Sequence, residues 1–488
     1  MNIAAGEQAL KIAVIGGGIS GLAAAYTIQE ASRAKNLNVT VFLIEAENRL
    51  GGKILTEQVD GYTIEGGPDC FLRQKPWAAQ LAGKIGLQSD LIGTNDKQRR
   101  VYVVNKGRLV PLPDGVMLIV PTRIMPFALS PLISIPGKIR MGLDLLVPPF
   151  KGERDESIGD FVRRRLGKEA LEKIAEPLLS GIHVSDPEKQ SLLATLPRFR
   201  ALEKNHGSLI QGMLKERKLA AKNKPVSGNG PTSLFLSLHN GLNQMVNKLE
   251  SSLQDVELLS GHRVNCLERQ SQGGFRIFLS GHAPLDVDAV ILAIPANDAS
   301  ELVEDIAPHI AAELQKIRYV STATISLAYR KSDIHQPFSG FGFVIPRKEK
   351  RDISACTWTS IKFNHRAPED TILLRCFVGG PGKEEMVSLS DNEMITVVRR
   401  ELKALMGLDA DPALTRIFRW EKANPQYDVE HLTLVRQIFD QCQEIPGLYL
   451  TGSAYEGVGI PDCIRQGQQV AKKVLDFLSE MKPEITVG

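Results

Sequence analysis

The chain has 488 residues, which is enough for roughly two or three domains, because single hydrophobic cores rarely grow beyond about 300 residues. Its 59 basic and 56 acidic side chains nearly balance, which argues against a dedicated nucleic-acid-binding protein with a strongly basic face. The 6 cysteines and 9 histidines are dispersed without the spacings of zinc sites, and no secretory segment precedes the first predicted strand. We therefore expect a cytoplasmic protein with reduced thiols, no bound metal and no nucleic-acid partner.

The first ordered stretch, residues 11–26, is typical of a strand, a tight turn and a helix. Gly16, Gly18 and Gly21 form the pattern G-x-G-x-x-G within it. The first two glycines of this pattern let a pyrophosphate approach the backbone, and the third lets the helix pack closely on the strand. Free N–H groups and a partial positive charge are expected at the helix start, which also contains Gly17, Ile19 and Ser20.

A second predicted strand, residues 39–45, ends in an acid, Glu45, which Ala46 follows. In a dinucleotide-binding fold, an acid at this position binds the ribose hydroxyls. An ordinary glycine loop would not require this combination of strand, helix and acid. The sequence therefore predicts a dinucleotide-binding site at residues 16–21 and Glu45, with Ala46 beside it.

Two further motifs distinguish between possible dinucleotides. Residues 49–53 (Arg-Leu-Gly-Gly-Lys) and 61–69 (Gly-Tyr-Thr-Ile-Glu-Gly-Gly-Pro-Asp) resemble motifs of the flavin amine oxidase superfamily. The resemblance implies FAD rather than a nicotinamide cofactor. It implies that the arginine and the Gly-Gly pair of the first motif line the diphosphate, and that the Gly-Gly pair of the second motif passes close to the isoalloxazine ring. The cofactor-binding residues implied are Arg49, Gly52, Lys53, Gly66, Gly67 and Pro68.

The middle of the chain contains an unusually apolar segment. A predicted helix at 77–86 and a predicted hairpin at 99–110 precede it. Residues 116–137 are very apolar, but prolines at 121, 126, 131 and 136 interrupt every helix before it could span a bilayer. We expect either a buried helical subdomain or a surface that contacts membrane lipid or lines a substrate entrance. Further on, we expect a solvated helix face at Arg163–Arg165 and a mobile loop at 215–231.

The second half returns to the cofactor. A helix at 241–253 precedes strands at 275–279 and 288–296, and β-rich residues 307–408 with a helix at 391–406 predict a mixed sheet that carries the substrate. Residues 447–452 predict a strand and a turn, and residues 457–464 open the last helix. The superfamily resemblance implies that this helix start faces the pyrimidine edge of the flavin. Further cofactor contacts implied are Val264, Ala293, Gly452, Val458, Gly459 and Ile460.

A narrower resemblance covers nearly the whole chain. Residues 65–72, 135–138, 161–167, 176–182, 377–380 and 457–462 are similar to the oxygen-dependent protoporphyrinogen/coproporphyrinogen oxidase family, and most similar to its soluble bacterial branch. This resemblance implies a six-electron oxidation of a porphyrinogen to a porphyrin in haem biosynthesis, with dioxygen as acceptor and hydrogen peroxide as product. Coproporphyrinogen III is the favoured substrate, and protoporphyrinogen IX is the alternative.

The family resemblance also implies a set of substrate contacts. Because the flavin would carry the redox step, no catalytic side chain is implied. Arg100, with Arg99 as the alternative, would pair with a substrate propionate, since a guanidinium matches a carboxylate in shape. Arg73 and Lys75 are either further cations for a tetracarboxylate or simply solvated. The remaining implied positions are Gly181, Thr357 and Leu373 around the macrocycle and Trp420 beside the flavin.

Two other functions stay open at this point. Another superfamily enzyme, such as an amine oxidase, is the remoter enzymatic alternative, although no signal for an aromatic cage is present. A flavin-containing structural or membrane-tethering protein would keep residues 16–21 but would not need residues 457–462 or Arg100. We expect a monomer or a homodimer, and peripheral membrane contact and a haem-pathway enzyme partner remain open.

The predicted fold class is α/β. We expect a Rossmann-type FAD-binding domain, a mixed α+β substrate domain and a helical subdomain that could associate with a membrane. The FAD-binding domain is discontinuous and comprises residues 1–97, 242–304 and 440–488. The substrate domain comprises residues 98–110, 209–241 and 305–439, and the helical subdomain comprises residues 111–208.

Overall fold

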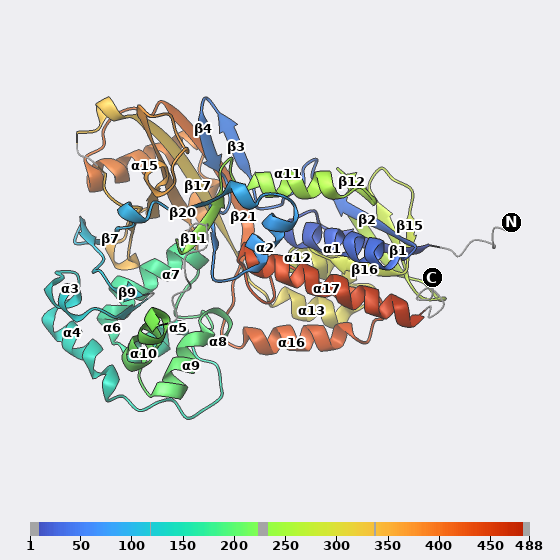
Figure 1. The fold of residues 1–488 in the computed structure, drawn as a ribbon, viewed down its shortest axis with the longest axis horizontal. Helices are drawn as coiled ribbons and strands as arrows, with labels where there is room; N and C mark the ends of the chain where they lie inside the picture. Colours follow the sequence, from blue (N-terminus) through green and yellow to red (C-terminus); the bar gives the residue numbers. More distant parts are fainter. Residues whose placement is uncertain (1–8, 118, 223–232, 336–337, 482–488) are drawn as a thin grey trace.

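A computed structural model describes residues 9–117, 119–222, 233–335 and 338–481. A five-stranded sheet with its covering helices lies on the right of Figure 1, a seven-stranded sheet lies at the upper left, and a group of helices lies at the lower left. Both strands predicted at the start of the chain are confirmed, as β1 (Leu10–Ile15) and β2 (Val39–Glu45). The predicted helix between them is confirmed as α1 (Ile19–Lys35).

The five-stranded sheet is wholly parallel and has the order β12-β2-β1-β16-β22. Its other strands are β12 (Val256–Ser260), β16 (Ala289–Leu292) and β22 (Leu448–Leu450). Ile12 and Val14 pack into the core on one face, and Ala13 and Ile15 pack into the core on the other. Burial on both faces explains why these strands are almost continuously apolar in sequence.

Helices cover both faces of this sheet. One face is covered by α1, α2 (Trp77–Lys84), α11 (Asn243–Ser252) and α17 (Ile460–Met481). The other face is covered by α12 (Ala296–Val303), α13 (Pro308–Gln315), α16 (His431–Cys442) and a small antiparallel sheet. That small sheet contains β13 (Val264–Arg269), β14 (Phe275–Leu279) and β15 (Leu285–Val287).

The seven-stranded sheet is mixed, as predicted, because β18 and β7 pair in parallel and the other neighbours pair antiparallel. Its strands in order are β21 (Leu414–Pro425), β17 (Tyr319–Arg330), β20 (Thr371–Gly379), β19 (Ile353–Trp358), β18 (Gly342–Val344), β7 (Val101–Asn105) and β8 (Arg108–Pro111). Helix α15 (Asp391–Met406) packs on one face through Met394, Val398 and Leu402. The opposite face is therefore left for the site described below.

The helical group has its own apolar core. It contains β9 (Val116–Met117), β10 (Val120–Pro121), α3 (Ile124–Leu129), α4 (Ile135–Gly142), α5 (Ile158–Arg165), α6 (Lys168–Ala170), α7 (Glu176–His183), α8 (Leu192–Thr195), α9 (Pro197–His206) and α10 (Leu209–Lys222). The predicted solvated face at Arg163–Arg165 is wrong for Arg165, which is fully buried and paired with Asp144. Helical periodicity turns this side chain inward, where the buried carboxylates of Asp144 and of Glu203 in α9 are available.

Three short segments join these parts. The hairpin of β3 (Thr56–Val59) and β4 (Tyr62–Glu65) leads into Gly66. Strand β11 (Phe235–Leu238) pairs with β5 (Phe71–Leu72) and β6 (Leu91–Gly93), and α14 (Thr359–Lys362) follows β19. The mobile loop predicted at 215–231 is wrong for residues 215–222, which continue α10, and residues 223–231 lie outside the described residues. Among the described residues, no helix combines the length and apolarity needed to cross a membrane.

Candidate functional site

The glycine turn after β1 has the geometry of a phosphate cradle. Gly16 has a φ of +106°, and a Cβ on Gly21 would lie 1.9 Å from the Gly16 carbonyl oxygen, so α1 is held directly against the turn. A Cβ on Gly18 would meet no atom within 4 Å, so this glycine borders open space at the start of α1. Ile19 and Ser20 are buried and begin the helix. The first and last glycines thus serve the fold, and Gly18 leaves room for a ligand.

Glu45 lies beside this turn. Its Oε2 accepts a hydrogen bond from the Gly17 N–H at 2.7 Å, and its Oε1 accepts one from the Glu47 N–H at 2.9 Å. Its backbone carbonyl accepts the N–H of His262, two residues before Val264 of β13. The structure therefore brings together the glycine turn, the predicted ribose-binding acid and the predicted adenine contact. Ala46 is exposed just after the strand.

The segment Arg49–Lys53 lies against the glycine turn of residues 16–18. Gly51 donates its N–H to the Gly17 carbonyl at 2.8 Å, and a Cβ on Gly52 would lie 3.2 Å from the Gly18 Cα. The Arg49 guanidinium donates to the Gly52 carbonyl at 2.7 Å, so it lies along the same segment. The backbone of Lys53 contacts the segment 61–69, because a Cβ on Gly67 would lie 1.7 Å from the Lys53 carbonyl oxygen.

The turn at Gly66, Gly67 and Pro68 is held from the large sheet. The Gly66 carbonyl accepts hydrogen bonds from Thr324 Oγ1 at 2.9 Å, Trp420 Nε1 at 2.9 Å and Arg375 Nη2 at 3.2 Å. Arg375 Nη2 also donates to the Gly67 carbonyl. Gly66 is buried, whereas Gly67 and Pro68 are half-buried. Strands β17, β20 and β21 thus fix the turn predicted to face the flavin ring.

The C-terminal segment completes the same region. Ala293 donates its N–H to the Ile15 carbonyl, and its own carbonyl oxygen lies 2.6 Å from a Cβ built on Gly16. Gly452 follows β22 with a φ of +133°, and the neighbouring Ser453 Oγ lies 3.3 Å from Lys53 Nζ. The predicted cofactor contacts before and at the start of α17 are Val458 and Gly459, which are partly exposed, and Ile460, which is buried.

One row of paired residues crosses the seven-stranded sheet and places the predicted substrate contacts. Gly342 of β18 pairs with Val101 on one side and Thr357 on the other, and Thr357 pairs with Arg375. Residues opposite one another share a face, so Thr357 lies on the face that holds the Gly66 turn. Arg100 immediately precedes Val101 and is exposed, about 10 Å along the sheet from Thr357.

The remaining predicted substrate positions differ in how exposed they are and in what they contact. Gly181 is exposed in α7, and a Cβ there would lie 3.5 Å from Val344 Cγ1 of β18. Leu373 is 1% exposed and packs with Tyr62 and Ile64 of β4. It is therefore covered by the hairpin, and its predicted contact with a macrocycle stays a prediction. Lys75 pairs with Asp462 at 2.5 Å, which gives this cation a structural partner.

A charged pair that the sequence reasoning missed lies beside the Gly66–Pro68 turn. Lys362 Nζ is 2.7 Å from Asp69 Oδ2 and 3.5 Å from Cys70 Sγ. Burial alone would raise the pKa of Asp69, but the charges of Lys362 and Arg375 hold it below its usual range. Burial and the Asp69 charge raise the pKa of the Cys70 thiol, so it stays protonated. This pair is a fixed charge, and Cys70 is not a nucleophile.

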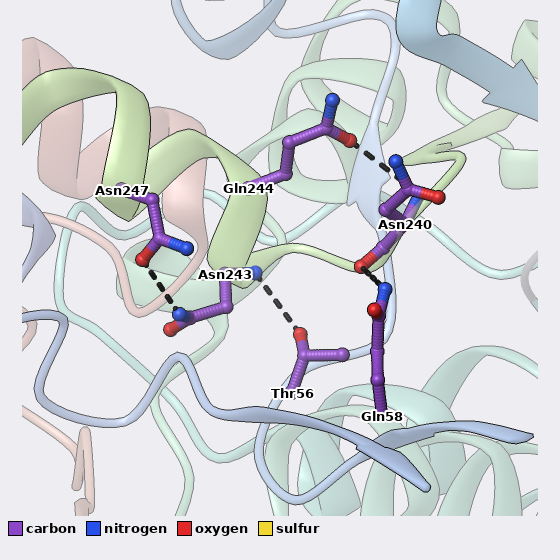
Figure 2. A pocket seen from close by; sticks show the side chains of 6 residues that line it. All are labelled: Thr56, Gln58, Asn240, Asn243, Gln244 and Asn247. Atoms are coloured by element: carbon purple, nitrogen blue, oxygen red, sulfur yellow. Dashed lines mark hydrogen bonds between the residues drawn. The ribbon is translucent and has the colours of Figure 1, made fainter. Parts of the chain in front are cut away.

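A pocket of about 410 Å³ lies away from these groups (Figure 2). It contains none of the predicted site residues, and its lining is rich in amides: Thr56, Gln58, Asn240, Asn243, Gln244 and Asn247. Thr56 Oγ1 accepts the Asn243 N–H at 3.0 Å and donates to Glu65 Oε2 at 2.7 Å. The pocket is thus connected to Glu65, the residue before the Gly66 turn.

Comparison with known proteins agrees with this geometry. The sequence model of the family described as flavin containing amine oxidoreductase matches residues 19–475. The chain belongs to this family. The resemblance stated from the sequence is therefore confirmed at the level of the superfamily, and the enzyme class is a flavin-containing oxidoreductase.

Comparison with individual proteins shows which members of the family are similar to this chain. The chain is 38% identical to a coproporphyrinogen III oxidase of Bacillus subtilis, over 96% of this chain and 98% of that protein. It is 37% identical to a coproporphyrinogen III oxidase of Staphylococcus aureus, over 95% of this chain and 98% of that protein. A chloroplastic protoporphyrinogen oxidase of Arabidopsis thaliana is 30% identical over 96% of this chain and 88% of that protein. The narrower resemblance is thus also confirmed.

Solved structures support the fold. An Exiguobacterium protein, provisionally assigned as a protoporphyrinogen oxidase, superposes with a TM-score of 0.84 at 33% identity and covers 96% of this chain and 99% of that one. A putrescine oxidase variant superposes with a TM-score of 0.67 at 16% identity, over 96% of this chain and 100% of that one, which supports the fold alone. The parallel sheet is the part expected to bind the dinucleotide of this flavin family.

The residues of the site fit a flavin dinucleotide. The open space at Gly18 would be filled by any side chain, and a dinucleotide needs that space for close approach to the backbone. No cluster of three or more potential metal-ligating side chains occurs within the part of the chain that the structure describes.

Sequence reasoning missed Arg375, Lys362 and Thr324. Their contacts join residues 309, 293 and 258 positions apart, so no local motif contains both partners. One signal was present, because Arg375 is the single charged residue within the otherwise apolar run 372–378. A charge in a buried strand needs a partner, and this requirement could have identified Arg375 as a candidate site residue from the sequence.

Proposed function

We propose that this chain is an FAD-dependent oxidase that converts coproporphyrinogen III to coproporphyrin III in haem biosynthesis, with dioxygen as the electron acceptor. The observation that carries the proposal is the similarity to two bacterial coproporphyrinogen III oxidases along nearly the full length of both chains. Plant protoporphyrinogen oxidases are related at lower identity, so protoporphyrinogen IX is the second candidate substrate.

FAD is the flavin that the site supports. The hydrogen-bonded cluster of Glu45, Gly17 and the segment before Val264 lies where the adenosine half of a dinucleotide would bind. The glycine turn, the start of α1 and the Arg49 guanidinium would hold the diphosphate. A flavin without the adenosine half would leave the predicted ribose-binding acid without a function.

When bound, FAD supplies the hydride acceptor, and the chain supplies position and charge. The sheet face that carries Thr357 and the half-buried Phe377 would form one wall of the porphyrinogen pocket. Gly342 is required in that row because its φ is +130° and a Cβ there would lie 2.0 Å from the Cys356 carbonyl oxygen. Arg100, at the rim, would bind a propionate, while the Lys362–Asp69 pair would keep a fixed polar boundary near the flavin turn.

We also propose the three-domain division predicted from the sequence, with one adjustment. Strand β11 pairs with β5 and β6, both inside the segment 1–97, and α10 packs against α9. Residues 209–222 are thus better grouped with the helical subdomain, and Phe235–Leu238 with the FAD-binding domain. The connection between the two groups lies largely outside the described residues.

A membrane-facing role is proposed for the apolar surface of α3 and α4, which form the far lower-left corner of Figure 1. Eight large apolar side chains here are between 43% and 79% exposed: Ile124, Met125, Leu129, Ile135, Ile139, Leu143, Leu145 and Leu146. The only acid within residues 123–150 is Asp144, which is fully buried against Arg165, whereas Arg123 is exposed. A continuous apolar surface with an exposed cation and no exposed acid suits an anionic lipid surface.

This surface can be tested by sedimentation with vesicles that contain anionic phospholipid. The protein should sediment with them, and Ile124→Ser combined with Leu129→Ser should reduce the bound fraction at least fivefold. A matched pair of substitutions at exposed Leu219 and Leu258, to serine, should leave it unchanged. Equal sedimentation of both variants would contradict the proposal.

The enzymatic proposal is tested by aerobic porphyrin fluorescence with coproporphyrinogen III and protoporphyrinogen IX in parallel, with hydrogen peroxide quantified. Faster turnover of coproporphyrinogen III, with 3 peroxides per porphyrin on the basis of six electrons, is expected. Preference for protoporphyrinogen IX would favour the second candidate. Absence of turnover on both substrates, with flavin bound, would overturn the proposal.

A further inference from the structure

Lys53 is the cation most closely enclosed by the predicted flavin-binding segments. Its backbone carbonyl lies against Gly67, its Nζ lies 3.3 Å from Ser453 Oγ, and its predecessor Gly52 lies against Gly18. The residue is half-buried, and its contacts reach Gly67, 14 positions away, through the backbone carbonyl and Ser453, 400 positions away, through Nζ. The fold has therefore placed this residue between the Gly66–Pro68 turn and the segment that follows Gly452, both of which are predicted to contact the cofactor.

Other cations near these segments are paired with carboxylates or with backbone carbonyls. Lys75 is paired with Asp462, Lys362 with Asp69, and the Arg375 guanidinium donates to two backbone carbonyls. Within the described ranges, by contrast, no carboxylate lies within 4.0 Å of Lys53 Nζ. Its Nζ donates a hydrogen bond to a neutral hydroxyl, that of Ser453. A charge that lacks a counter-ion in a partly dehydrated place is costly unless a ligand supplies the opposite charge.

The electrostatics of Lys53 reflect this position. Burial lowers the pKa of Lys53 to about 8, and the nearby Cys463 thiol acts in the opposite direction. The neighbouring titratable groups on α17 and before α2 are Asp462 and Lys75, which neutralise each other. The ammonium group thus remains mostly protonated at neutral pH and has positive charge available for a bound anion.

Resting on the proposed FAD site, we propose that Lys53 provides the positive charge opposite the flavin ring and raises the reduction potential of the bound flavin. Two electrons and one proton add a negative charge to the ring, and a fixed cation beside it stabilises that charge. Lys53 is placed for the ring rather than the diphosphate, because its backbone carbonyl lies against Gly67 and its Nζ lies 3.3 Å from Ser453 Oγ. The diphosphate is assigned instead to residues 16–18 and Arg49, which contact the preceding residue, Gly52.

The test compares Lys53→Met with Lys53→Arg in the purified holoprotein. The midpoint potential is measured by anaerobic dye equilibration, and the affinity for sulfite, which adds to the flavin ring as an anion, is measured by absorbance. Lys53→Met should weaken sulfite binding at least tenfold and lower the potential by about 30 mV or more, the equivalent of tenfold for two electrons. Lys53→Arg should restore most of both values, because it keeps the charge.

The matched control is Lys84→Met, at the exposed end of α2, which should change neither value. An unchanged potential in Lys53→Met would overturn the proposal. Loss of FAD from that variant would also overturn it, because a cation that serves the ring should leave the diphosphate contacts intact. Neither measurement uses a porphyrinogen. A wild-type protein that binds FAD but does not turn over porphyrinogen would therefore contradict the proposed function without affecting this test of Lys53.

Discussion

Trp420 donates its indole N–H to the carbonyl oxygen of Gly66 at 2.9 Å, across 354 positions of sequence. The same oxygen accepts hydrogen bonds from Thr324 and Arg375, so three strands of the large sheet converge on one peptide group. A carbonyl has two lone pairs, and three donors hold it more firmly than a single bond would. The position of the Gly66 turn is thus fixed by the seven-stranded sheet.

Trp420→Phe should loosen this turn without emptying the space. The phenyl ring keeps part of the packing against Gly67, and the loss of one hydrogen bond costs about 1 kcal/mol, so FAD binding should weaken roughly fivefold. The dissociation constant is measured by ultrafiltration and flavin fluorescence. Trp77→Phe, in α2, makes the same chemical change away from the turn and should leave the constant unaltered. Equal effects of the two substitutions would contradict this role.

Arg375→Met should be more damaging, because the guanidinium is 4% exposed and binds both glycine carbonyls. Its removal also leaves the buried Asp69 with only Lys362 as a neighbouring cation. Loss of one member of a buried charged network typically costs about 3–5 kcal/mol, so a large fall in the thermal midpoint is expected. Arg375→Lys should recover only part of it, since an ammonium cannot span two carbonyls in one plane. A wild-type midpoint in both variants would show that the turn does not depend on this residue.

Two glycines of the first turn should respond differently to the same change. Gly18→Ala introduces a methyl group into open space, and φ at this position is −69°, so the fold should persist while FAD retention falls strongly. Gly21→Ala would place a methyl group 1.9 Å from the Gly16 carbonyl oxygen and should destabilise the whole unit. Circular dichroism and flavin absorbance separate the two outcomes. A yellow, fully loaded Gly18→Ala protein would contradict the cofactor assignment.

The sequence predicted the elements whose signals are local. The glycine turn, Glu45, the hairpin at 99–110 and α15 each lie within a short stretch, and the structure has them at or within a few residues of the predicted bounds. The charges of Arg165, Lys362 and Arg375 could not be assigned in this way, because their partners are set by packing between distant segments. The exposure of the apolar α3 and α4 surface was left open, since apolar composition predicts a buried and a lipid-contacting face equally well.

Arg100→Ala should raise the Michaelis constant for coproporphyrinogen III about tenfold, because a charge-assisted hydrogen bond to a propionate contributes roughly 1.5 kcal/mol at an exposed site. Flavin content should not change, since Arg100 lies just before β7, three strands along the sheet from β20, whereas the Gly66 turn is held from β17, β20 and β21. Arg99→Ala is the matched variant, because it removes a neighbouring exposed guanidinium from the same loop. A larger effect in Arg99→Ala would move the propionate contact to that residue.

Glu65 should make stability depend on pH. It is 2% exposed, and burial raises its pKa to about 7, although the Thr56 hydrogen bond and the Arg366 charge act in the opposite direction. Its ordinary pKa is 4.5, so between these values the folded state binds more protons than the unfolded state. The stability from this group is therefore complete below about pH 4.5 and is lost as the pH rises through 7, by about 3 kcal/mol at most.

Glu65→Gln removes this titration but keeps a side chain of similar shape. The thermal midpoint of the variant should increase relative to that of the parent as the pH rises from 5 to 8. Both are measured with FAD in excess so that cofactor loss does not contribute. Glu47→Gln, at an exposed position after β2, is the control and should show no such trend. A midpoint difference that stays constant across the range would mean that Glu65 is ionised throughout. Its hydrogen bonds to Thr56 and Leu242 and its proximity to Arg366 would then outweigh its burial.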